Sequence, residues 1–445
     1  MDTPICDFVR KYTENGTVRL HMPGHKGAAY LGMEALDLTE IRGADSLYEA
    51  EGIIAKSEEN AAGLFGCPTF YSTEGSSQCI RAILYLIAAY AGEQGRRPLV
   101  AAARNVHKTY LTAAALLDVE TRWLYAESDA GYLSCDLTPA DLDRYLTDAP
   151  EKPAAVYVTS PDYLGRVADI RGLARVCHDH GVLLAVDNAH GAYLRFLPQS
   201  LHPIDLGADI CCDSAHKSLP VLTGGAYLHL SAELNKILGH QVRNAMMIFG
   251  STSPSYLILQ SLDGVNPFLE TYPKTLETML PGIAAMKENL RRWGYTLYGD
   301  EPLKLTVAPK SYGYTGDQLA DELRRRNMEP EFSDPDYVVL LLSAQPEGAL
   351  LNNLEQVLCS IPRKTPITDT YPAFMPPEQV MTPREAMLSP SEQLPAHRCL
   401  GRVLAVPSVG CPPAVPILVC GEKIDTYALE CFRYYGIESC FVVKN

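Results

Sequence analysis

Residues 182–191 read VLLAVDNAHG, residues 208–217 read ADICCDSAHK, and these two stretches decide the fold. In each, an apolar run suited to a buried strand ends in polar residues. Residues 153–160 predict another buried strand, and residues 170–180 predict an amphipathic helix. This strand–helix–strand rhythm gives right-handed βαβ units, so we expect an α/β fold with a mostly parallel sheet covered on both faces. Ligands of such sheets bind beyond the carboxyl ends of the strands, where the polar residues lie.

The chain of 445 residues divides into three regions by its pattern. At roughly 100–200 residues per domain, this length predicts two or three domains. Residues 1–51 show Gly and Pro punctuation and little periodicity, as expected of an arm that packs on another surface, which could be a partner subunit. Residues 52–262 form the predicted large domain. Residues 263–445, with a Pro-rich linker or crossover at about 365–395, form a predicted smaller α+β domain.

The composition excludes several classes of protein. Hydrophobic residues make up 47% of the chain, which argues against a disordered protein. With 38 Lys and Arg against 53 Asp and Glu, the net charge of −15 gives no attraction to nucleic acid or to a membrane surface. The longest apolar run, residues 82–91, is about half of the ~20 residues that cross a bilayer, and the N-terminus lacks the pattern of a signal peptide. We expect a soluble protein with a small-molecule partner.

The cysteines bear on location and on metal binding. Thirteen cysteines without paired spacing predict free buried thiols and a cytoplasmic location. Residues 177–180 read CHDH, which are residue types that bind metals. They lie at the end of a predicted helix, where their side chains point in different directions. We therefore predict no metal site.

Lys217 and Asp187 are the first pair of candidate site residues. A lysine at the end of a buried strand is desolvated, which lowers its pKa and makes it an amine nucleophile suited to a Schiff base. An Asp at a neighbouring strand end can hold a pyridinium N–H. Taken singly, Lys217 could be a surface lysine and Asp187 a helix N-cap or turn residue. The two residues support each other, because one cofactor needs both.

Two further segments add a phosphate cradle and a stacking ring. Ser76 and Ser77, in the segment YSTEGSSQ at residues 71–78, open a predicted helix whose N–H groups and dipole favour a phosphate. Ordinary N-capping by Ser76 is the alternative. His107 follows another apolar run and could stack on a planar ring, or it could be a satisfied core histidine. Together, the four features indicate pyridoxal 5′-phosphate as the cofactor.

With these residues in place, the sequence resembles the Orn/Lys/Arg decarboxylases of fold type I, in particular the short members that lack an N-terminal wing domain. The matching segments occur in the family's order along most of the chain. They are HMPGHKG at 21–27, HK at 107–108, SPDYLG at 160–165, DNAH at 187–190, SAHK at 214–217, STSPSY at 251–256, PREA at 383–386, GRV at 401–403 and PPAVP at 412–416.

The resemblance implies a role for each matching position. Lys217 would form the Schiff base, Asp187 would bind the pyridine nitrogen, and Ala189 and His107 would contact the two ring faces. The remaining implied cofactor residues are Ser76, Ser77, His190, Ser214 and His216, with Ser251 and Thr252 reaching the phosphate from a neighbouring subunit. The resemblance also implies a cytoplasmic homodimer or higher homo-oligomer with active sites at the interface, and a place in polyamine biosynthesis.

Three positions depart from the family pattern. Glu74 stands where the family has Asn, Asp162 where it has Thr, and Asn188 where it has Glu. They lie around the substrate side of the cofactor, so they concern substrate identity rather than cofactor binding. Carboxylates must meet the distal cation of a basic substrate, and Glu40, Asp45 and Glu74 are the candidates, with surface solvation as the alternative for each.

The predicted reaction is α-decarboxylation of arginine, lysine or ornithine to the corresponding amine and CO₂. Lys217, Asp187 and His216 are the predicted catalytic residues, with His216 or Lys217 as the proton donor. An aminotransferase or a β-eliminating lyase on the same fold is the first alternative, because the cofactor supports several reactions. A non-catalytic binding protein that keeps the fold is the second.

Overall fold

The computed structural model describes residues 1–125, 137–342, 348–372, 375–411 and 415–444. Its centre is a seven-stranded sheet in the order β1-β7-β6-β5-β4-β2-β3. Strands β3, β2, β4, β5 and β6 run parallel, and β7 is antiparallel to both β6 and β1. The mostly parallel sheet was predicted, and this prediction is confirmed. The strands are β1 (Thr69–Ser72), β2 (Leu99–Ala103), β3 (Glu120–Leu124), β4 (Ala155–Thr159), β5 (Leu183–Asp187), β6 (Ile210–Asp213) and β7 (Ala226–Leu230).

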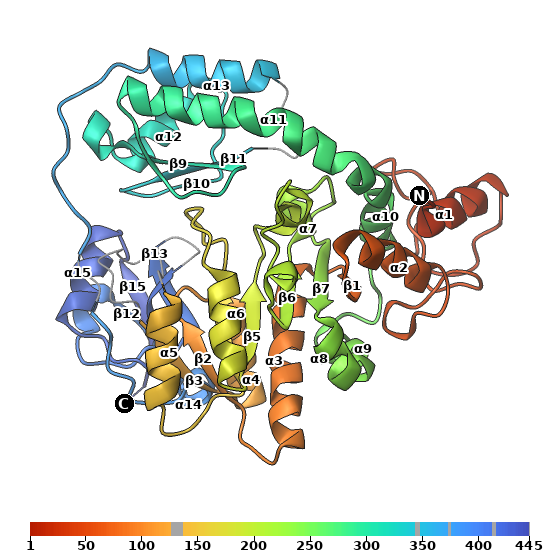
Figure 1. Ribbon diagram of the computed structural model, residues 1–445, viewed down its shortest axis with the longest axis horizontal. Coiled ribbons are helices and arrows are strands. Elements are labelled where there is room, and N and C mark those ends of the chain that lie inside the picture. Colours follow the sequence, from red (N-terminus) through yellow and green to blue (C-terminus); the bar gives the residue numbers. More distant parts are fainter. Residues whose placement is uncertain (126–136, 343–347, 373–374, 412–414, 445) are drawn as a thin grey trace.

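Helices cover both faces of this sheet (Figure 1). Alternate residues of each strand point to opposite faces. Val100 and Ala102 therefore join the apolar cluster under α3 (Gly75–Glu93) and α4 (Lys108–Leu117). Ala101 and Ala103 join the cluster under α5 (Pro139–Asp148) and α6 (Ile170–Asp179). Helix α6 matches the predicted helix, and its amphipathic pattern explains why only one of its faces is buried.

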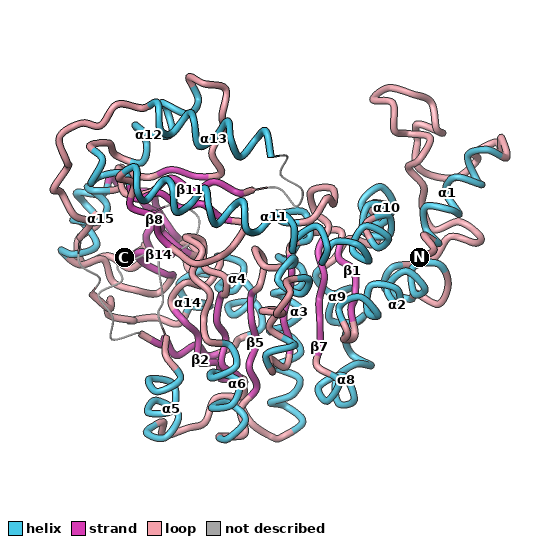
Figure 2. Tube along the Cα trace, turned by 45° about the horizontal axis from the view of Figure 1, so that its top comes forward, coloured by secondary structure: helices cyan, strands magenta, loops and turns pink. Residues whose placement is uncertain are grey.

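The N-terminal segment contains more structure than the sequence predicted. Helix α1 (Pro4–Glu14) packs its buried Ile5 and Val9 beside α2 (Ile53–Phe65) and α10 (Tyr256–Gly264) (Figure 2). These two side chains lie one turn apart, which is too short an apolar pattern to stand out in the sequence. Most of residues 15–46 have no regular structure, in agreement with the expected arm.

A second sheet, in the order β10-β11-β9-β8, lies after the long helix α11 (Asn266–Trp293). Figure 1 shows this unit above the carboxyl ends of the large sheet. Helix α11 contains Pro273 and Pro281. The elements of this unit are β8 (Thr296–Tyr298), β9 (Lys304–Ala308), α12 (Gly316–Arg324), β10 (Phe332–Ser333), β11 (Val338–Leu341) and α13 (Gly348–Ser360).

The last part of the chain forms a third small unit beside β2 and β3. In the expected Pro-rich crossover, the described residues 365–372 and 375–382 form no helix or strand, whereas the later part contains α14 and β12. The elements are α14 (Pro383–Leu388), β12 (Ser391–Pro395), β13 (Ser408–Cys411), β14 (Val415–Val419), α15 (Thr426–Tyr434) and β15 (Ser439–Val443). Across the described residues, no helix is both long and apolar enough to cross a membrane. The shorter helices of the large domain are α7 (Ala215–Ser218), α8 (Ala232–Leu238) and α9 (Val242–Phe249).

Candidate active site

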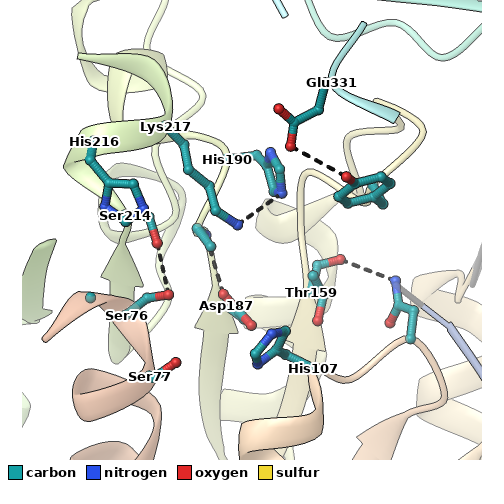
Figure 3. A pocket seen from close by; sticks show the side chains of 14 residues that line it. Ser76, Ser77, His107, Thr159, Asp187, His190, Ser214, His216, Lys217 and Glu331 are labelled. Carbon is teal, nitrogen blue, oxygen red and sulfur yellow. Dashed lines mark hydrogen bonds between the residues drawn. The ribbon is translucent and has the colours of Figure 1, made fainter. Parts of the chain in front are cut away.

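A pocket of about 280 Å³ lies at the carboxyl ends of β4, β5 and β6, where the sheet rule predicted it (Figure 3). The parallel register brings Thr159 of β4 beside Asp187 of β5, and Asp187 beside Cys212 of β6. Residues from distant parts of the chain therefore meet at one edge. The lining residues are Gly75, Ser76, Ser77, Asn105, His107, Thr159, Tyr163, Asp187, Ala189, His190, Ser214, His216, Lys217 and Glu331.

One side of the pocket has the features of an anion site. Helix α3 begins at Gly75, which adopts a positive φ of 71° and donates its N–H to the Gly224 carbonyl at 2.7 Å. The hydroxyl groups of Ser76 and Ser77 lie in the first turn, and Ser214 donates a hydrogen bond to Ser76 at 2.8 Å. Glu74, not Ser76, occupies the N-cap position, so ordinary capping does not explain Ser76. The helix dipole and these hydroxyls favour a bound phosphate.

The floor of the pocket is formed by the buried carboxylate of Asp187, the imidazole of His107 and the small side chain of Ala189. Asp187 is 2% exposed, and its Oδ1 accepts the Ala189 N–H at 3.2 Å. His107 is the N-cap of α4, where its Nδ1 accepts the Thr109 N–H at 3.2 Å, so its ring orientation is fixed. Burial lowers the pKa of His107. Asp187 and His107 both point into the cavity in Figure 3, while Ala189 leaves room for a planar ring.

Lys217 is in direct contact with an imidazole. Its Nζ lies 3.1 Å from Nε2 of His190. Burial lowers the pKa of Lys217, and the charge of Asp187 opposes this effect. Burial also lowers the pKa of His190 well below its usual value, and the positive charges of Lys304 and Lys217 add to that effect. A neutral His190 is therefore able to accept a hydrogen bond from Lys217.

His216 lies beside the anion site. Its Nδ1 donates to the Gly225 carbonyl at 3.0 Å, and its ring is 3.9 Å from the point where a Cβ of Gly75 would lie. Burial lowers the pKa of His216 as well. This placement is suited to a phosphate contact.

The carboxylates predicted to recognise the substrate do not line this pocket. Asp45 accepts backbone N–H groups of Ser46, Glu51, Gly52 and Ile54, so it organises the start of α2. Glu40 is exposed and lies outside the pocket.

The segment around Ser251 also lies outside the pocket. Glu74 is exposed and accepts the Ser251 N–H. Ser251 and Thr252 are exposed and do not line this chain's pocket, so their contact across a subunit interface stays a prediction. Asp162 is buried, and its Oδ1 accepts the Arg166 N–H at 2.8 Å, which shapes the loop after β4.

Glu331 is a carboxylate that lines the pocket and was not predicted from the sequence. It directly precedes β10, and one of its oxygens accepts the Tyr163 hydroxyl at 3.3 Å. The Tyr163 ring in turn packs edge-on against His190, with centroids 5.4 Å apart. Glu331 is exposed in a polar segment, so no pattern in the sequence distinguishes it from a surface residue. Asn105 and Thr159, which also line the pocket, lie at strand ends where they could have been proposed.

The structure separates the side chains of the segment CHDH. His178 pairs with Asp209, His180 pairs with Asp143, and Cys177 is buried in the apolar cluster under α6. A different group, made of His202, Cys211 and Asp213, has the types and spacing of possible metal ligands among the described residues. Its contacts are considered below.

Comparison with known proteins adds the chemistry of relatives. Residues 3–291 match the family model described as Orn/Lys/Arg decarboxylase, major domain. The chain is 29% identical to an arginine decarboxylase of Bacillus subtilis, in an alignment that covers 95% of this chain and 91% of that protein.

Solved structures share the fold. A lysine decarboxylase of Francisella novicida superposes with a TM-score of 0.81 at 17% identity, covering 99% of this chain and 81% of the other. A structure of SPT with PLP superposes with a TM-score of 0.55 at 15% identity, covering 69% of this chain and 75% of the other. Both neighbours have the type I fold of PLP enzymes, so the predicted fold class is confirmed.

Proposed function

The chain belongs to the Orn/Lys/Arg decarboxylase family, which makes it a PLP-dependent decarboxylase of basic amino acids, and we propose that its substrate is arginine. The proposed products are CO₂ and the amine that keeps the guanidinium group. The observation that carries the choice of substrate is Glu331, a carboxylate at the pocket wall opposite the cofactor cradle. A planar guanidinium can bind both oxygens of a carboxylate, whereas an ammonium acts as a point charge. The arginine decarboxylase of Bacillus subtilis supports the same choice.

The residues of the pocket fit pyridoxal 5′-phosphate. Ser76, Ser77, Ser214 and His216 would hold its phosphate, since they gather around the start of α3. Asp187 would accept the pyridine N–H, and His107 and Ala189 would contact the ring. The bound cofactor supplies the electron sink that cleavage of the bond between Cα and the carboxylate requires.

Lys217 is the amine that would attach the cofactor. A lysine must lose a proton before it can act as a nucleophile. Burial lowers the pKa of Lys217 and so favours loss of that proton. Neutral His190 can accept a hydrogen bond from Nζ at Nε2, at 3.1 Å, which orients the amine. Of the two predicted proton donors, Lys217 is favoured for the return of a proton to Cα, because its Nζ has this partner. Nδ1 of His216 is already bonded to the Gly225 carbonyl beside the anion site.

Asp187 holds the opposite end of the ring. Its burial and its bond to the Ala189 N–H keep the carboxylate in one orientation. An ionised carboxylate at this point would keep the pyridine nitrogen protonated, which strengthens the electron sink. The proposed division of work is thus proton transfer at Lys217, orientation of its amine by His190, charge stabilisation at Asp187, and substrate selection at Glu331.

Decarboxylation is favoured over the alternative reactions by the family match, not by the fold. The fold also carries SPT, so the architecture alone does not choose which bond is broken. A cytoplasmic homodimer remains part of the proposal. The eleven cysteines whose side chains the structure describes are free thiols, which suits a reducing compartment. The predicted cross-subunit contacts of Ser251 and Thr252 require a dimer.

The test is to purify the protein with PLP, record its visible absorption, and measure CO₂ released from arginine, lysine and ornithine. We expect an absorption band of the lysine-bound cofactor and turnover with arginine above the other two. Lys217→Ala should lose both the band and the turnover. Lys236→Ala, an exposed lysine paired with Glu233, is the matched control and should keep both. A band without CO₂ from any of the three amino acids would refute decarboxylation.

A further inference from the structure

Four fully buried polar side chains meet directly behind the pocket. Asp213, the last residue of β6, is bonded by Asn188, His202 and His229, and none of the four has any exposed surface. Nδ2 of Asn188 donates to Oδ1 of Asp213 at 2.7 Å. Nε2 of His202 and Nε2 of His229 each lie 3.2 Å from Oδ2.

These bonds keep a buried carboxylate ionised. A carboxylate without partners in this position would be costly to bury. Burial by itself raises the pKa of Asp213, but the two imidazoles outweigh it and hold the pKa well below its usual range. The second ring nitrogen of His229 contacts the Thr69 hydroxyl at 2.9 Å, so the cluster is anchored to the antiparallel edge of the sheet. The two imidazoles therefore hold Oδ2 of Asp213 in place, and its Oδ1 is free to hold Asn188.

Asn188 and Asp213 each adjoin a residue of the cofactor cradle. Asn188 follows Asp187, and Asp213 precedes Ser214, while Asp187 and Ser214 both line the pocket. The backbone N–H of Asn188 also donates to the Cys212 carbonyl at 3.0 Å. One side-chain bond and one backbone bond thus fix the end of β5 against the end of β6. The distance between the Asp187 carboxylate, which would bind the ring nitrogen, and the Ser214 hydroxyl, which would bind the phosphate, depends on this junction.

We propose that Asp213 is a positioning residue of the cofactor site, which acts through Asn188 to hold Asp187 and Ser214 at the separation that the cofactor requires. This inference rests on the proposed use of PLP. It assigns Asn188 to the junction of β5 and β6, because its amide is directed away from the pocket and toward Asp213. From the sequence, Asn188, which stands where the family has Glu, had been expected on the substrate side of the cofactor.

The same cluster could be read as a metal site, but its bonds favour the positioning role. Sγ of Cys211 lies 3.9 Å from Nε2 of His202, and the ligand atoms of His202, Cys211 and Asp213 lie within 4.8 Å of one another. Both oxygens of Asp213, however, already accept hydrogen bonds from donors at 2.7 to 3.2 Å. Hydrogen bonding accounts for the geometry without an ion. A metal is therefore an outcome of the test rather than the proposal.

The experiment measures PLP affinity of the apoprotein, without substrate, by absorption and fluorescence titration. Asp213→Asn keeps the volume but replaces one acceptor oxygen by an N–H₂ group, which must face a donor. We expect the Kd for PLP to rise by about tenfold or more and the absorption maximum of the bound cofactor to shift.

The matched control is Asp209→Asn. Asp209 adjoins the other end of β6, where its Oδ2 is bonded by His178 at 3.1 Å and by the Leu184 N–H at 2.8 Å. With a rise of roughly 3.3 Å per residue, the two carboxylates lie about 13 Å apart along the strand. Asp209→Asn should change the Kd for PLP less than about twofold, since it removes the same kind of bond away from the cofactor.

A double-mutant cycle tests whether Asp213 acts through Asn188. Asn188→Ala leaves Asp213 with both imidazoles and keeps the experiment decisive if Asp213→Asn fails to fold. If the two residues act as one unit, the double variant binds PLP no more weakly than the weaker single variant. Fully additive losses would overturn the proposal, as would wild-type affinity in Asp213→Asn.

Two further outcomes are distinguishable. Failure of the wild-type protein to bind PLP would refute the proposed function itself, whereas normal binding by both wild type and Asp213→Asn would refute only the positioning role. Elemental analysis of the wild-type protein completes the test. One tightly bound zinc per chain, lost in Asp213→Asn, would overturn the positioning role in favour of a metal site.

Discussion

Lys217 and His190 show how the pocket sets protonation at single residues. Both side chains are desolvated, which lowers both pKa values, and they lie within hydrogen-bond distance of each other, so a neutral imidazole can hold the amine in place. Tyr163 packs on His190 and bonds Glu331, which links the proton-transfer end of the pocket to its substrate-binding end.

Removing the charge of Glu331 should weaken arginine binding. Glu331→Gln loses charge-assisted hydrogen bonds worth about 1.5–3 kcal/mol, so the KM for arginine should rise roughly 10- to 100-fold while the PLP absorption band stays unchanged. Glu329→Gln is the matched control, because Glu329 is exposed two residues earlier and pairs with Arg324 at 2.9 Å. Steady-state kinetics of both variants checks the prediction. An unchanged KM in Glu331→Gln would remove the structural argument for arginine.

Burial of neutral His190 should make stability depend on pH. Its pKa is lowered in the folded state, so below about pH 6.5 the unfolded chain binds a proton there that the folded chain does not. The free energy of unfolding of the wild type should therefore fall, relative to His190→Gln, by up to about 1.4 kcal/mol per pH unit below 6.5.

Urea unfolding of the apoproteins at several pH values between 5.5 and 7.5 measures this difference. His397→Gln, at an exposed histidine, is the control and should show a constant difference from the wild type. A constant difference for His190→Gln as well would mean that folding does not change the pKa of His190.

At the scale of elements, the beginnings of helices carry much of the site's order. Helix α3 directs its first turn at the anion site, and α4 begins at His107, which caps that helix and lines the pocket. The start of helix α2, at Ile53, is held by Asp45, which had been predicted to meet the substrate. The carboxylate of Asp45 is used for backbone N–H groups instead, and this is a structural task.

Asp45→Ala should therefore reduce stability. It leaves several backbone N–H groups at the start of α2 without their acceptor, at an expected cost of about 1–3 kcal/mol in the free energy of unfolding. Glu40→Ala, at an exposed carboxylate, should cost less than about 0.5 kcal/mol. Chemical unfolding of the two apoprotein variants measures these changes in the free energy of unfolding. A stable Asp45→Ala variant with a raised KM for arginine would restore Asp45 as a substrate residue.

At the scale of the whole molecule, three parts of the chain meet around one pocket. The large sheet supplies the cofactor residues, the four-stranded unit supplies Glu331, and the last unit is attached behind the pocket through Arg104 and Glu422. Arg104 follows β2 and forms two bonds with Glu422, of 2.6 and 2.7 Å, with both side chains buried. Asn105, the next residue, lines the pocket. The pair therefore connects the C-terminal unit to the wall of the site.

Replacing Arg104 alone should destabilise the protein more than replacing both partners of this ion pair. Arg104→Leu leaves the Glu422 carboxylate buried without its guanidinium, at an expected cost of about 3–5 kcal/mol, and adding Glu422→Gln should recover part of that loss. Lys423→Ala is the control, because its pair with Glu378 is exposed and worth less than about 1 kcal/mol. Thermal unfolding measures all of these variants. Equal losses in the single and double variants would mean that packing, not the buried charge, dominates here.

The sequence by itself determined the α/β fold, the mostly parallel sheet and the positions of Ser76, His107, Asp187 and Lys217 at the pocket edge. It could do so because the apolar runs locate the strands, and the topology of parallel sheets brings their carboxyl ends together. Pattern and chain order are local properties that can be read without coordinates.

Only the tertiary structure decided what the polar side chains contact. Glu331 reaches the pocket from a segment more than a hundred residues after Lys217, and Asp45 is occupied by the start of α2. His202 and His229 meet at Asp213 because packing brings three chain segments together in an apolar interior. An exposed carboxylate, a capping carboxylate and a pocket carboxylate look alike in sequence, because the difference between them lies in non-local partners and in burial.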